Sequence, residues 1–364
     1  MLKAYKYYLV PNVKQSIVLN KTFGCVRYFW NKQVEAFNSY DKENNPSVVF
    51  KTSTEIRKEN EWMKEVSAAA IQQKEIDFKE FKKQHFSKGR KNKIGRPSFK
   101  KRNGNNSFRL PNQKFAILQR YIRLERIGKV KFVEDRPLPE NCKLMSVTVS
   151  KDACGQYYAS VLVETEIKQF EKTKKTVGID VGIKEFATLS DGTIINNPHY
   201  FRDSQTKLRK AQRCLSKKKR GSSRYKKCKL TVAKIHKKIA NQRDYFLHNV
   251  STKIVKQFDV ISIEDLNVAG MVKNRKLAKS ISDVSFSKFF SMLQYKANWY
   301  GKELVKIPRF APSSKTCSKC GNVKQELKLS ERTYHCDVCG HEQDRDLNAS
   351  LNINRIGVEM LKRA

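Results

Sequence analysis

The sequence predicts a chain of several domains that combines α/β and α+β architecture. Its 364 residues are enough for roughly two or three domains of ordinary size. Hydrophobic residues make up 39% of the chain, so a core can form. Helix-spaced apolar residues fill the first quarter, whereas strand-like alternation dominates residues 107–167. Neither an all-helical nor an all-strand fold accommodates both patterns.

The first quarter of the chain begins with a predicted strand and continues as helices. Residues 1–11 alternate in the manner of a strand, with Tyr5, Tyr7 and Leu9 on one face. Residues 14–83 are mostly helical in pattern, and residues 63–81, rich in Ala, Lys, Glu and Gln, predict a second helix. The clearest helical spacing is that of Phe23, Val26, Phe29 and Trp30.

A basic segment follows at residues 81–102, which hold ten Lys or Arg and no acid. Gly89, Gly95 and Pro97 break any helix there. Such a run is usually a solvated loop, but the interleaved Phe81, Phe86 and Phe99 favour contact with nucleic acid. The candidate contacts are Lys82, Lys83, Arg90, Lys91, Arg96, Lys100, Lys101 and Arg102. Gln72 and Gln73 on the preceding helix either read adenine edges or are ordinary exposed residues.

The middle of the chain changes to strands and then to a basic helical pair. Short strands are expected around Ile117, Leu124, Val130 and Phe132, and two alternating runs joined by residues 151–156 predict a hairpin. Residues 168–176 form a polar linker. Residues 203–257 are helical and basic, broken at 216–227, and predict a helical hairpin that is either solvated or lies along a phosphate backbone.

The charge points to a polyanionic partner. The chain has 75 Lys and Arg against 35 Asp and Glu, a formal net charge of +40. DNA or RNA fits this charge better than a membrane, since no basic amphipathic helix and no apolar run of about 20 residues is present. The N-terminus also lacks a secretory signal, so we expect a soluble intracellular protein. Charge alone leaves a plain RNA-binding protein open.

The first candidate catalytic acid is Asp180. Residues 176–197 predict three strands joined by tight turns. On the first strand Val177 and Ile179 share one face and Asp180 lies on the other, between Gly178 and Gly182. The glycines leave room around the acid for metal ions and a phosphate backbone. A buried structural Asp without a partner would be costly.

The second candidate acid is Glu264, at the carboxyl end of a buried strand over residues 260–263. Open α/β sheets place their sites at such strand ends. Ser262 and Glu264 share a face, whereas Asp265 faces the other way and is expected to cap a helix. The alternative for Glu264 is an acid at that helix N-terminus.

A third acid is expected at the start of the last helix, where Asp344 and Asp346 stand. One of the two can be a helix cap with no catalytic role. Three carboxylates suit two Mg²⁺ or Mn²⁺ ions that activate water for phosphodiester hydrolysis. No His or Ser nucleophile stands out, which agrees with attack by water.

Four cysteines predict one structural zinc ion. Cys317-x2-Cys320 and Cys336-x2-Cys339 are separated by fifteen residues, and a glycine follows each pair. Two such turns supply four thiolates to a tetrahedral Zn²⁺, a zinc ribbon. Lys315 and Lys319 can offset the charge of the thiolates, and the neighbouring histidines are surplus. The remaining cysteines are expected to be reduced and without a special role: Cys25, Cys142, Cys154, Cys214 and Cys228.

These motifs together resemble the TnpB family, insertion-sequence-encoded RNA-guided DNA endonucleases related to the type V CRISPR effectors. The resemblance rests on the order GIDVG (178–182), IEDL (263–266), the two cysteine pairs and DRDLNA (344–349). VRYFWN (26–31) and GRPSFKKR (95–102) also resemble the family. It spans the whole chain.

The resemblance implies an architecture. An RNase H-like (RuvC) nuclease core would occupy residues 171–310 and 341–364, with the zinc ribbon at 311–340 inserted in it. A β-barrel wedge domain would be formed by 1–11 and 103–170, and a helical recognition domain by 12–102.

The resemblance also implies an activity. The catalytic acids would be Asp180, Glu264 and Asp346, with Asp344 as the alternative third acid. The partners would be a guide RNA from the transposon end and a double-stranded DNA target beside a short motif, bound by a monomer in the prokaryotic cytoplasm at the nucleoid. Two alternatives remain: an RNA-guided repressor without cleavage, and a DNA transposase.

Overall fold

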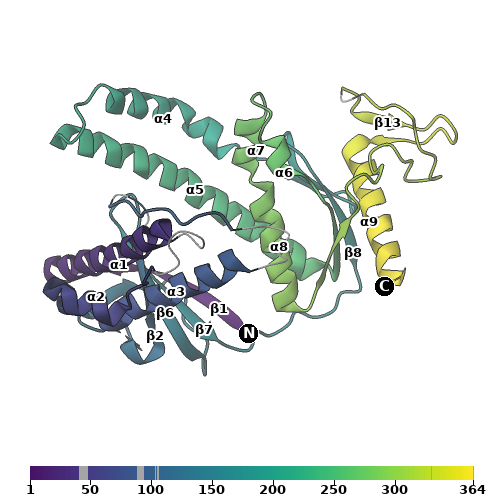
Figure 1. Ribbon diagram of the computed structural model, residues 1–364. Coiled ribbons are helices and arrows are strands. Elements are labelled where there is room, and N and C mark those ends of the chain that lie inside the picture. The colour runs from purple at the N-terminus through teal and green to yellow at the C-terminus, as the bar shows by residue number, and fades with distance from the viewer. Residues whose placement is uncertain (41–47, 88–93, 103, 105, 329, 364) are drawn as a thin grey trace. The chain divides into compact units, whose positions relative to one another are not determined.

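The computed structural model describes residues 1–40, 48–87, 94–102, 104, 106–328 and 330–363 (Figure 1). The chain divides into two compact units, Met1–Glu166 and Ile167–Ala364. None of the described helices combines the length and the apolar character that crossing a membrane requires.

The first unit contains a seven-stranded sheet in which every pair is antiparallel. Its order is β2-β6-β7-β1-β5-β4-β3. The long central strands are β1 (Leu2–Val10), β6 (Lys143–Lys151) and β7 (Tyr157–Glu164), and the shorter ones are β2 (Asn106–Pro111), β3 (Phe115–Leu118), β4 (Tyr121–Leu124) and β5 (Gly128–Val133). The expected first strand and the hairpin at 151–156 are confirmed.

This sheet must curl. Its edge strands β2 and β3 are joined only by the 3₁₀ turn η2 (Asn112–Lys114). Seven strands about 4.8 Å apart would separate the edges of a flat sheet by about 29 Å. Four residue steps reach at most about 14 Å. The edges therefore approach each other, although β2 and β3 do not pair among the described strands, so hydrogen bonding does not close a barrel there.

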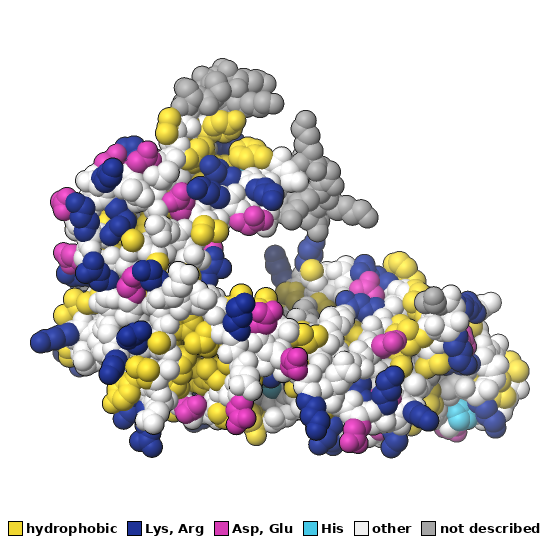
Figure 2. All heavy atoms as spheres, turned by 90° about the horizontal axis from the view of Figure 1, so that it is seen from below, with side chains coloured by type: hydrophobic (Ala, Val, Ile, Leu, Met, Phe, Trp, Pro, Cys, Tyr) yellow, Lys and Arg dark blue, Asp and Glu magenta, His cyan; other side chains and the backbone are white. Residues whose placement is uncertain are grey.

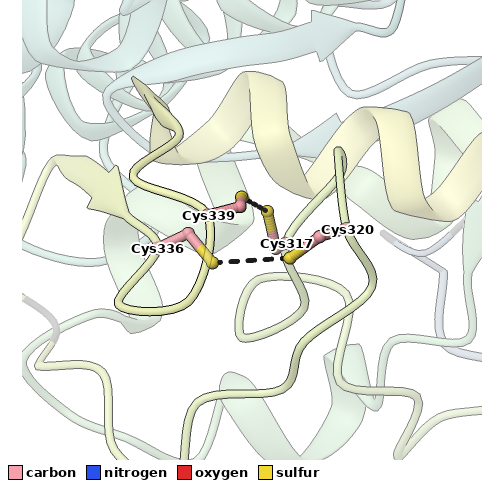
Figure 3. Close-up of side chains that lie close together, drawn as sticks. All are labelled: Cys317, Cys320, Cys336 and Cys339. Carbon is pink, nitrogen blue, oxygen red and sulfur yellow. Dashed lines mark hydrogen bonds between the residues drawn. The ribbon is translucent and has the colours of Figure 1, made fainter.

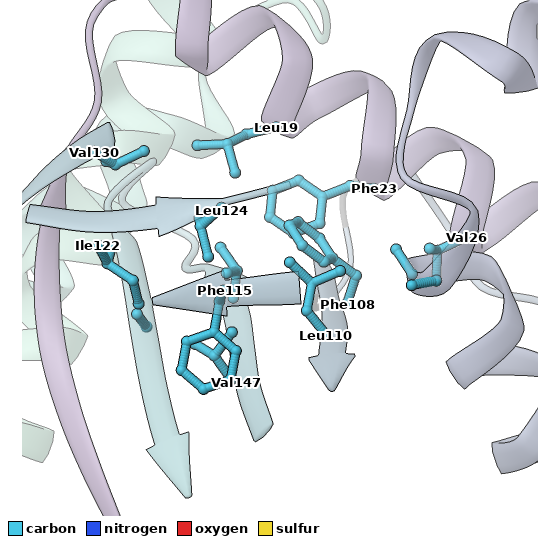
Figure 4. Close-up of a cluster of buried hydrophobic side chains, with 14 of the residues drawn as sticks. Leu19, Phe23, Val26, Phe108, Leu110, Phe115, Ile122, Leu124, Val130 and Val147 are labelled. Carbon is cyan, nitrogen blue, oxygen red and sulfur yellow. The ribbon is translucent and has the colours of Figure 1, made fainter. Parts of the chain in front are cut away.

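Helices cover the sheet and share its core. α1 (Val13–Ser39) starts at a capping box in which Asn12 and Gln15 bond each other's backbone N–H. α2 (Ser53–Glu59), the 3₁₀ turn η1 (Glu61–Glu65) and α3 (Ala68–Phe86) follow. One hydrophobic core joins α1 and the strands, and a smaller cluster of Val34, Phe37 and Phe78 lies between α1 and α3. Figure 4 labels ten side chains of the larger core: Leu19, Phe23, Val26, Phe108, Leu110, Phe115, Ile122, Leu124, Val130 and Val147.

The helix expected over residues 63–81 is displaced. Met63 lies in η1 with its side chain fully buried, and α3 begins only at Ala68 and runs on to Phe86. The Ala, Lys and Glu content indicates a helix but does not locate its ends. Where α3 begins depends on the tertiary packing of the preceding turn.

The second unit is built on a five-stranded mixed sheet, in the order β10-β9-β8-β11-β12. β8 (Thr176–Val181), β9 (Glu185–Leu189) and β10 (Ile194–Asn196) form the expected antiparallel meander. β11 (Val260–Glu264) and β12 (Glu303–Ile307) continue the sheet in parallel with β8.

Helices lie on both faces of this sheet (Figure 1). α4 (Tyr200–Ser216) and α5 (Ser223–Gln257) form the expected hairpin, and α6 (Val268–Met271), α7 (Ala278–Val284) and α8 (Phe286–Tyr300) follow β11. α5 and α8 share a core with Val177, Ile179, Ile261 and Ile263 of the strands. α9 (Arg345–Arg363) packs on the opposite face against β8 and β11.

An ion pair between Asp259 and the buried Lys302 fixes the segment that leads into β8. Asp259 accepts hydrogen bonds from the backbone N–H of Thr173 at 3.0 Å and of Lys174 at 2.6 Å. Its third partner is the ammonium of Lys302, whose side chain is fully buried. Desolvation of the carboxylate is outweighed by these bonds, which lower the pKa of Asp259 to about 2.

Candidate catalytic site and metal centre

Two acids from neighbouring strands lie on the face of the sheet that α9 covers. The register pairs Ser262 with Gly178 and Ile263 with Ile179, so Glu264 and Asp180 each follow one residue later on adjacent parallel strands. Both isoleucines are buried in the core with α5 and α8. Because side chains alternate along a strand, the two acids point to the opposite face. The faces predicted from the sequence are confirmed.

Gly178, two residues before Asp180, makes room for α9 rather than for a ligand. A Cβ on Gly178 would lie 2.1 Å from the carbonyl oxygen of Ser350 and 2.4 Å from the backbone N of Asn354. On α9 itself, a Cβ on Gly357 would lie 2.0 Å from Oγ of Ser262. The sequence-based expectation that Gly178 leaves room for metal ions is therefore wrong: its missing side chain lets α9 approach the sheet.

The start of α9 gives its two acids different tasks. Oδ1 of Asp344 accepts hydrogen bonds from the backbone N–H of Asp346 at 2.9 Å and of Leu347 at 3.0 Å. This is an N-cap, which satisfies donors that the first helical turn leaves open. The carboxylate of Asp346 makes no such bond within the described residues and stands in the first turn.

The three carboxylates influence one another electrostatically. Desolvation raises the pKa of Asp180 well above its usual value, the negative charges of Glu264 and Asp346 raise it further, and Arg345 opposes them. Of the two acids at the start of α9, Asp346 is thus the one whose charge raises the pKa of Asp180. Two neighbouring negative charges and one cation therefore act on Asp180.

Glu264 and Asp265, at the end of β11, have different partners. Oγ of Ser313 donates a hydrogen bond to Glu264. Asp265 pairs with Arg309 at 2.6 Å, and the side chain of Asn267 caps α6 instead. The expectation that Asp265 caps a helix is wrong, because the chain runs two residues further before α6 starts.

Two asparagines inside α9 connect the helix to the segment that enters the cysteine cluster. Asn348 accepts from the backbone N–H of Ser318 at 2.9 Å and donates to the carbonyl of Thr316 at 2.8 Å. Asn352 donates to the carbonyls of Ser313 and Thr316 at 2.9 and 2.6 Å. These bonds explain why polar residues occupy a buried helix face.

The four cysteines converge in the geometry of a metal site (Figure 3). Among the described residues they are the group of potential ligands whose donor atoms all lie within 4.8 Å of one another. Sγ of Cys317 is 3.7 Å from that of Cys339, and Sγ of Cys320 is 3.6 Å from that of Cys336. The three carboxylates do not form so tight a group. The cysteine geometry could hold a tetrahedral metal ion such as zinc.

Both cysteine turns have the same construction. The N–H of Gly321 bonds the carbonyl of Cys317, and the N–H of Gly340 bonds the carbonyl of Cys336, each at 2.9 Å. The glycines have φ of +80° and +66°, which other residues rarely adopt. His341 contacts Ser318 and Gln343 rather than the sulfur atoms. Lys315, expected near the thiolates, donates to the carbonyl of Gln325.

The basic segment is partly fixed to α1 and α3. Trp30 donates to the carbonyl of Ser98 at 3.0 Å, and Asn31 bonds both backbone groups of Lys100. The ammonium of Lys100 lies 4.4 Å from the centre of the Trp30 ring, and burial lowers its pKa to about 8. That of Lys82 lies 3.7 Å from the centre of the Phe50 ring. Both lysines therefore lie against aromatic rings.

The other candidate contacts divide by exposure. Exposed side chains are those of Gln72, Lys83, Arg96, Lys101 and Arg102, whereas Gln73 is half-buried. Arg90 and Lys91 lie outside the described residues. Phe81 is partly buried in an aromatic cluster with Trp30 and Phe37. Phe86 and Phe99 remain exposed. Lys and Arg side chains are spread over the face that Figure 2 shows.

Family models match three segments of the chain. Residues 1–45 match a model described as "Helix-turn-helix domain", and residues 159–275 match "Probable transposase". Residues 286–353, which include the four cysteines, match "Cas12f1-like, TNB domain".

Two relatives align with nearly the whole chain. A protein of Streptomyces pristinaespiralis named "Putative RNA-guided DNA endonuclease" is 38% identical over 98% of this chain and 89% of its own length. The protein InsQ of Escherichia coli K12, of the same description, is 31% identical over 99% of this chain and 93% of its own.

Similarity of fold extends to a solved complex. The Cas12f1 chain in a Cas12f1–sgRNA–target DNA complex aligns with 93% of this chain and 82% of its own, with a TM-score of 0.54. At 14% sequence identity this likeness concerns the fold alone.

Proposed function

Because this chain belongs to the TnpB family, we propose that it is an RNA-guided DNA endonuclease, which hydrolyses phosphodiester bonds of target DNA beside a short adjacent motif. The proposal is supported by Asp180 and Glu264, which lie on one face of the second unit's sheet, and by Asp346 of α9, whose charge acts on Asp180. An RNA-guided repressor would need none of these acids. The mixed sheet with α9 on that face supports an RNase H-like (RuvC) core.

Asp180, Glu264 and Asp346 would hold two Mg²⁺ or Mn²⁺ ions. Bound there, the ions would activate a water for attack and stabilise the leaving oxygen of the phosphodiester. The residues fit this group because Asp180 is desolvated and the negative charges of Glu264 and Asp346 act on it, so that bound cations would favour its ionised form. The chain itself positions the acids: β8 and β11 fix two of them in register, and the Asp344 cap fixes the helix end that presents the third.

The four cysteines would hold one structural Zn²⁺. The proposed ribbon, residues 311–340, is inserted before α9, and its entry is bonded to α9 through Asn348 and Asn352. Loss of zinc should therefore disturb the helix that carries Asp346. Metal analysis of the purified protein tests this: Cys317→Ser should release the zinc that the wild type retains, and a zinc-free wild type would contradict the assignment.

The remaining domains follow the same family. We assign the wedge domain to residues 1–11 and 103–170, the recognition domain to 12–102, and the nuclease to 171–310 and 341–364. The guide RNA would derive from the transposon end. The exposed Arg96, Lys101 and Arg102 would bind phosphates of this RNA or of the DNA. Base pairing with the guide would select the target.

The test begins with the RNA that co-purifies with the protein. After sequencing, its guide segment is replaced and a matching DNA is supplied with Mg²⁺. The cut should move to the new match, and Asp180→Ala and Glu264→Ala should abolish cleavage while guided binding survives. Cleavage that ignores the guide, or that persists in either variant at near wild-type rate, would refute the proposal.

A second candidate is a DNA transposase, which the description of the model matching residues 159–275 favours. Three carboxylates and two metal ions also suit strand transfer. The two activities differ in product: transposon ends incubated with the protein and Mg²⁺ would become joined to a second DNA only if the chain is a transposase.

A further inference from the structure

A groove begins at the carboxyl end of β11, beside Glu264. It has a volume of about 430 Å³, within the range of pockets that hold small ligands. One wall is the segment that follows β11, including Asp265 and Leu266, and the other is α8. We call it the α8 groove. Glu264 is among the residues that line the groove, so the groove reaches one of the three proposed metal-binding acids, whereas Asp180 and Asp346 do not line it.

The α8 wall is a stripe of exposed polar residues. Ser287, Ser291, Gln294 and Asn298 recur every three or four residues and so share one helix face. The core lies elsewhere on α8, at buried residues such as Phe289 and Leu293. The stripe is therefore not required for packing.

The chemistry of the stripe is neutral, which is unusual for a chain of net charge +40. Lys306 is the one cationic side chain among the described residues that line the groove. Phosphate groups are bound in proteins chiefly by arginine and lysine. Besides the acids Glu264 and Asp265, the groove offers carboxamides, hydroxyls and the half-buried rings of Phe290 and Tyr295. These groups suit a nucleobase, with its hydrogen-bonding edge and its stacking face.

Two carboxamides are already arranged as a pair. Nε2 of Gln294 donates to Oδ1 of Asn298 at 3.2 Å, one helical turn away. This bond leaves the carbonyl oxygen of Gln294 as an acceptor and the NH₂ of Asn298 as a donor for a further partner. A donor and an acceptor side by side match the edge of a base better than a phosphate, which offers acceptors only.

We propose that the α8 groove receives a base of the DNA strand next to the phosphodiester that is cut, held by Gln294 and Asn298. The proposal rests on the proposed function, since Glu264 marks the cleavage site only if the chain is a nuclease. It assigns to these two residues the positioning of the strand, not chemistry.

Cleavage kinetics with the RNA-loaded protein test the assignment. The double variant Gln294→Ala/Asn298→Ala should lower kcat/KM at least tenfold with an unchanged Tm, and Asn249→Ala, an exposed amide on α5, is the matched control. DNA with one abasic site, moved along the strand, should be cut poorly by the wild type at one position near the cut, and the double variant should lose this position dependence. Equal kcat/KM and an equal abasic profile in both proteins would overturn the proposal.

A photocrosslink separates failure of the groove from failure of the proposed function. Benzoylphenylalanine placed at Ser291 should crosslink to bound single-stranded DNA, and the same group at Asn249 should not. If the wild type never cleaves DNA, the proposed function fails whatever the crosslink shows. If it cleaves but position 291 gives no more crosslink than position 249, the groove is refuted alone.

Discussion

Replacing Gly178 by alanine tests how closely α9 must approach the sheet. The new Cβ would stand 2.1 Å from the carbonyl oxygen of Ser350 and 2.4 Å from the N of Asn354, both backbone atoms of α9. Ordinary contact begins at 3.4 Å, so the helix would have to move by about 1.3 Å. A backbone cannot rotate away as a long side chain can, and the shift is therefore shared by the whole helix.

The shift should reduce both stability and cleavage. Overpacking of this kind costs about 1–3 kcal/mol. For a unit of about 200 residues, 3 kcal/mol corresponds to a Tm about 6–12 °C lower. Asp346 lies on the same helix, one turn before Ser350, and a displacement of about 1 Å in a catalytic group can cost about 100-fold in rate. Gly178→Ala should therefore cleave about 100-fold more slowly than the wild type.

The measurements are a thermal melt and single-turnover cleavage with the guide RNA bound. Gly24→Ala is the matched control: Gly24 lies inside α1, its added Cβ would be 4.0 Å from the nearest atom, and alanine favours a helix by about 1 kcal/mol. This control should melt no lower than the wild type. If Gly178→Ala melts and cleaves as the wild type does, the close approach of α9 is not what positions the acids.

Three further outcomes are expected. Asp344→Ala should lose about 1 kcal/mol of stability, the value of an N-cap, and keep measurable cleavage, whereas Asp346→Ala should abolish cleavage; the reverse pattern in urea melts and cleavage assays would exchange their roles. Asp259, with its pKa lowered to about 2, stabilises the fold above its usual pKa and loses this effect as pH falls from about 4 towards 2. Asp259→Asn should thus cost at most about 2 kcal/mol at pH 6, a difference from the wild type that narrows below pH 4 in urea titrations; a constant difference would contradict it. Sγ of Cys214 lies 3.2 Å from Sγ of Cys228, so glutathione disulfide should oxidise the pair to a disulfide while forming two reduced glutathiones, seen by non-reducing peptide mapping; thiols that both stay alkylatable would refute this.

Local patterns in the sequence were enough for the elements that carry the site. Two-residue alternation correctly separates Ile179 from Asp180 and Ile263 from Glu264, because strand geometry alone decides the faces. The cysteine spacing likewise brings four sulfur atoms together, since each turn is complete within five residues. Sequence could not give the register of β8 against β11, which depends on residues some 84 positions apart.

The errors come from partners distant in the sequence. The cations of residues 81–102 look equivalent in a charge count, yet Lys82 and Lys100 lie against aromatic rings of Phe50 and Trp30. Nothing within a helical window identifies those rings as neighbours. The pairing of Cys214 with Cys228 was missed for the same reason, since it requires the two helices of the hairpin to meet in one register.

Asp344 and Asp346 differ in the structure in a way that the motif does not reveal. In the sequence both acids precede an apolar helix, and both suit a cap or a metal ligand. The structure uses the carboxylate of Asp344 to accept two N–H groups of the first turn, which fixes its orientation along the helix axis. Asp346 stands two residues later, and its charge adds to that of Glu264 in raising the pKa of Asp180. An acid that already satisfies the helix end has fewer lone pairs for a metal ion, so the cap itself argues that Asp346 is the third ligand.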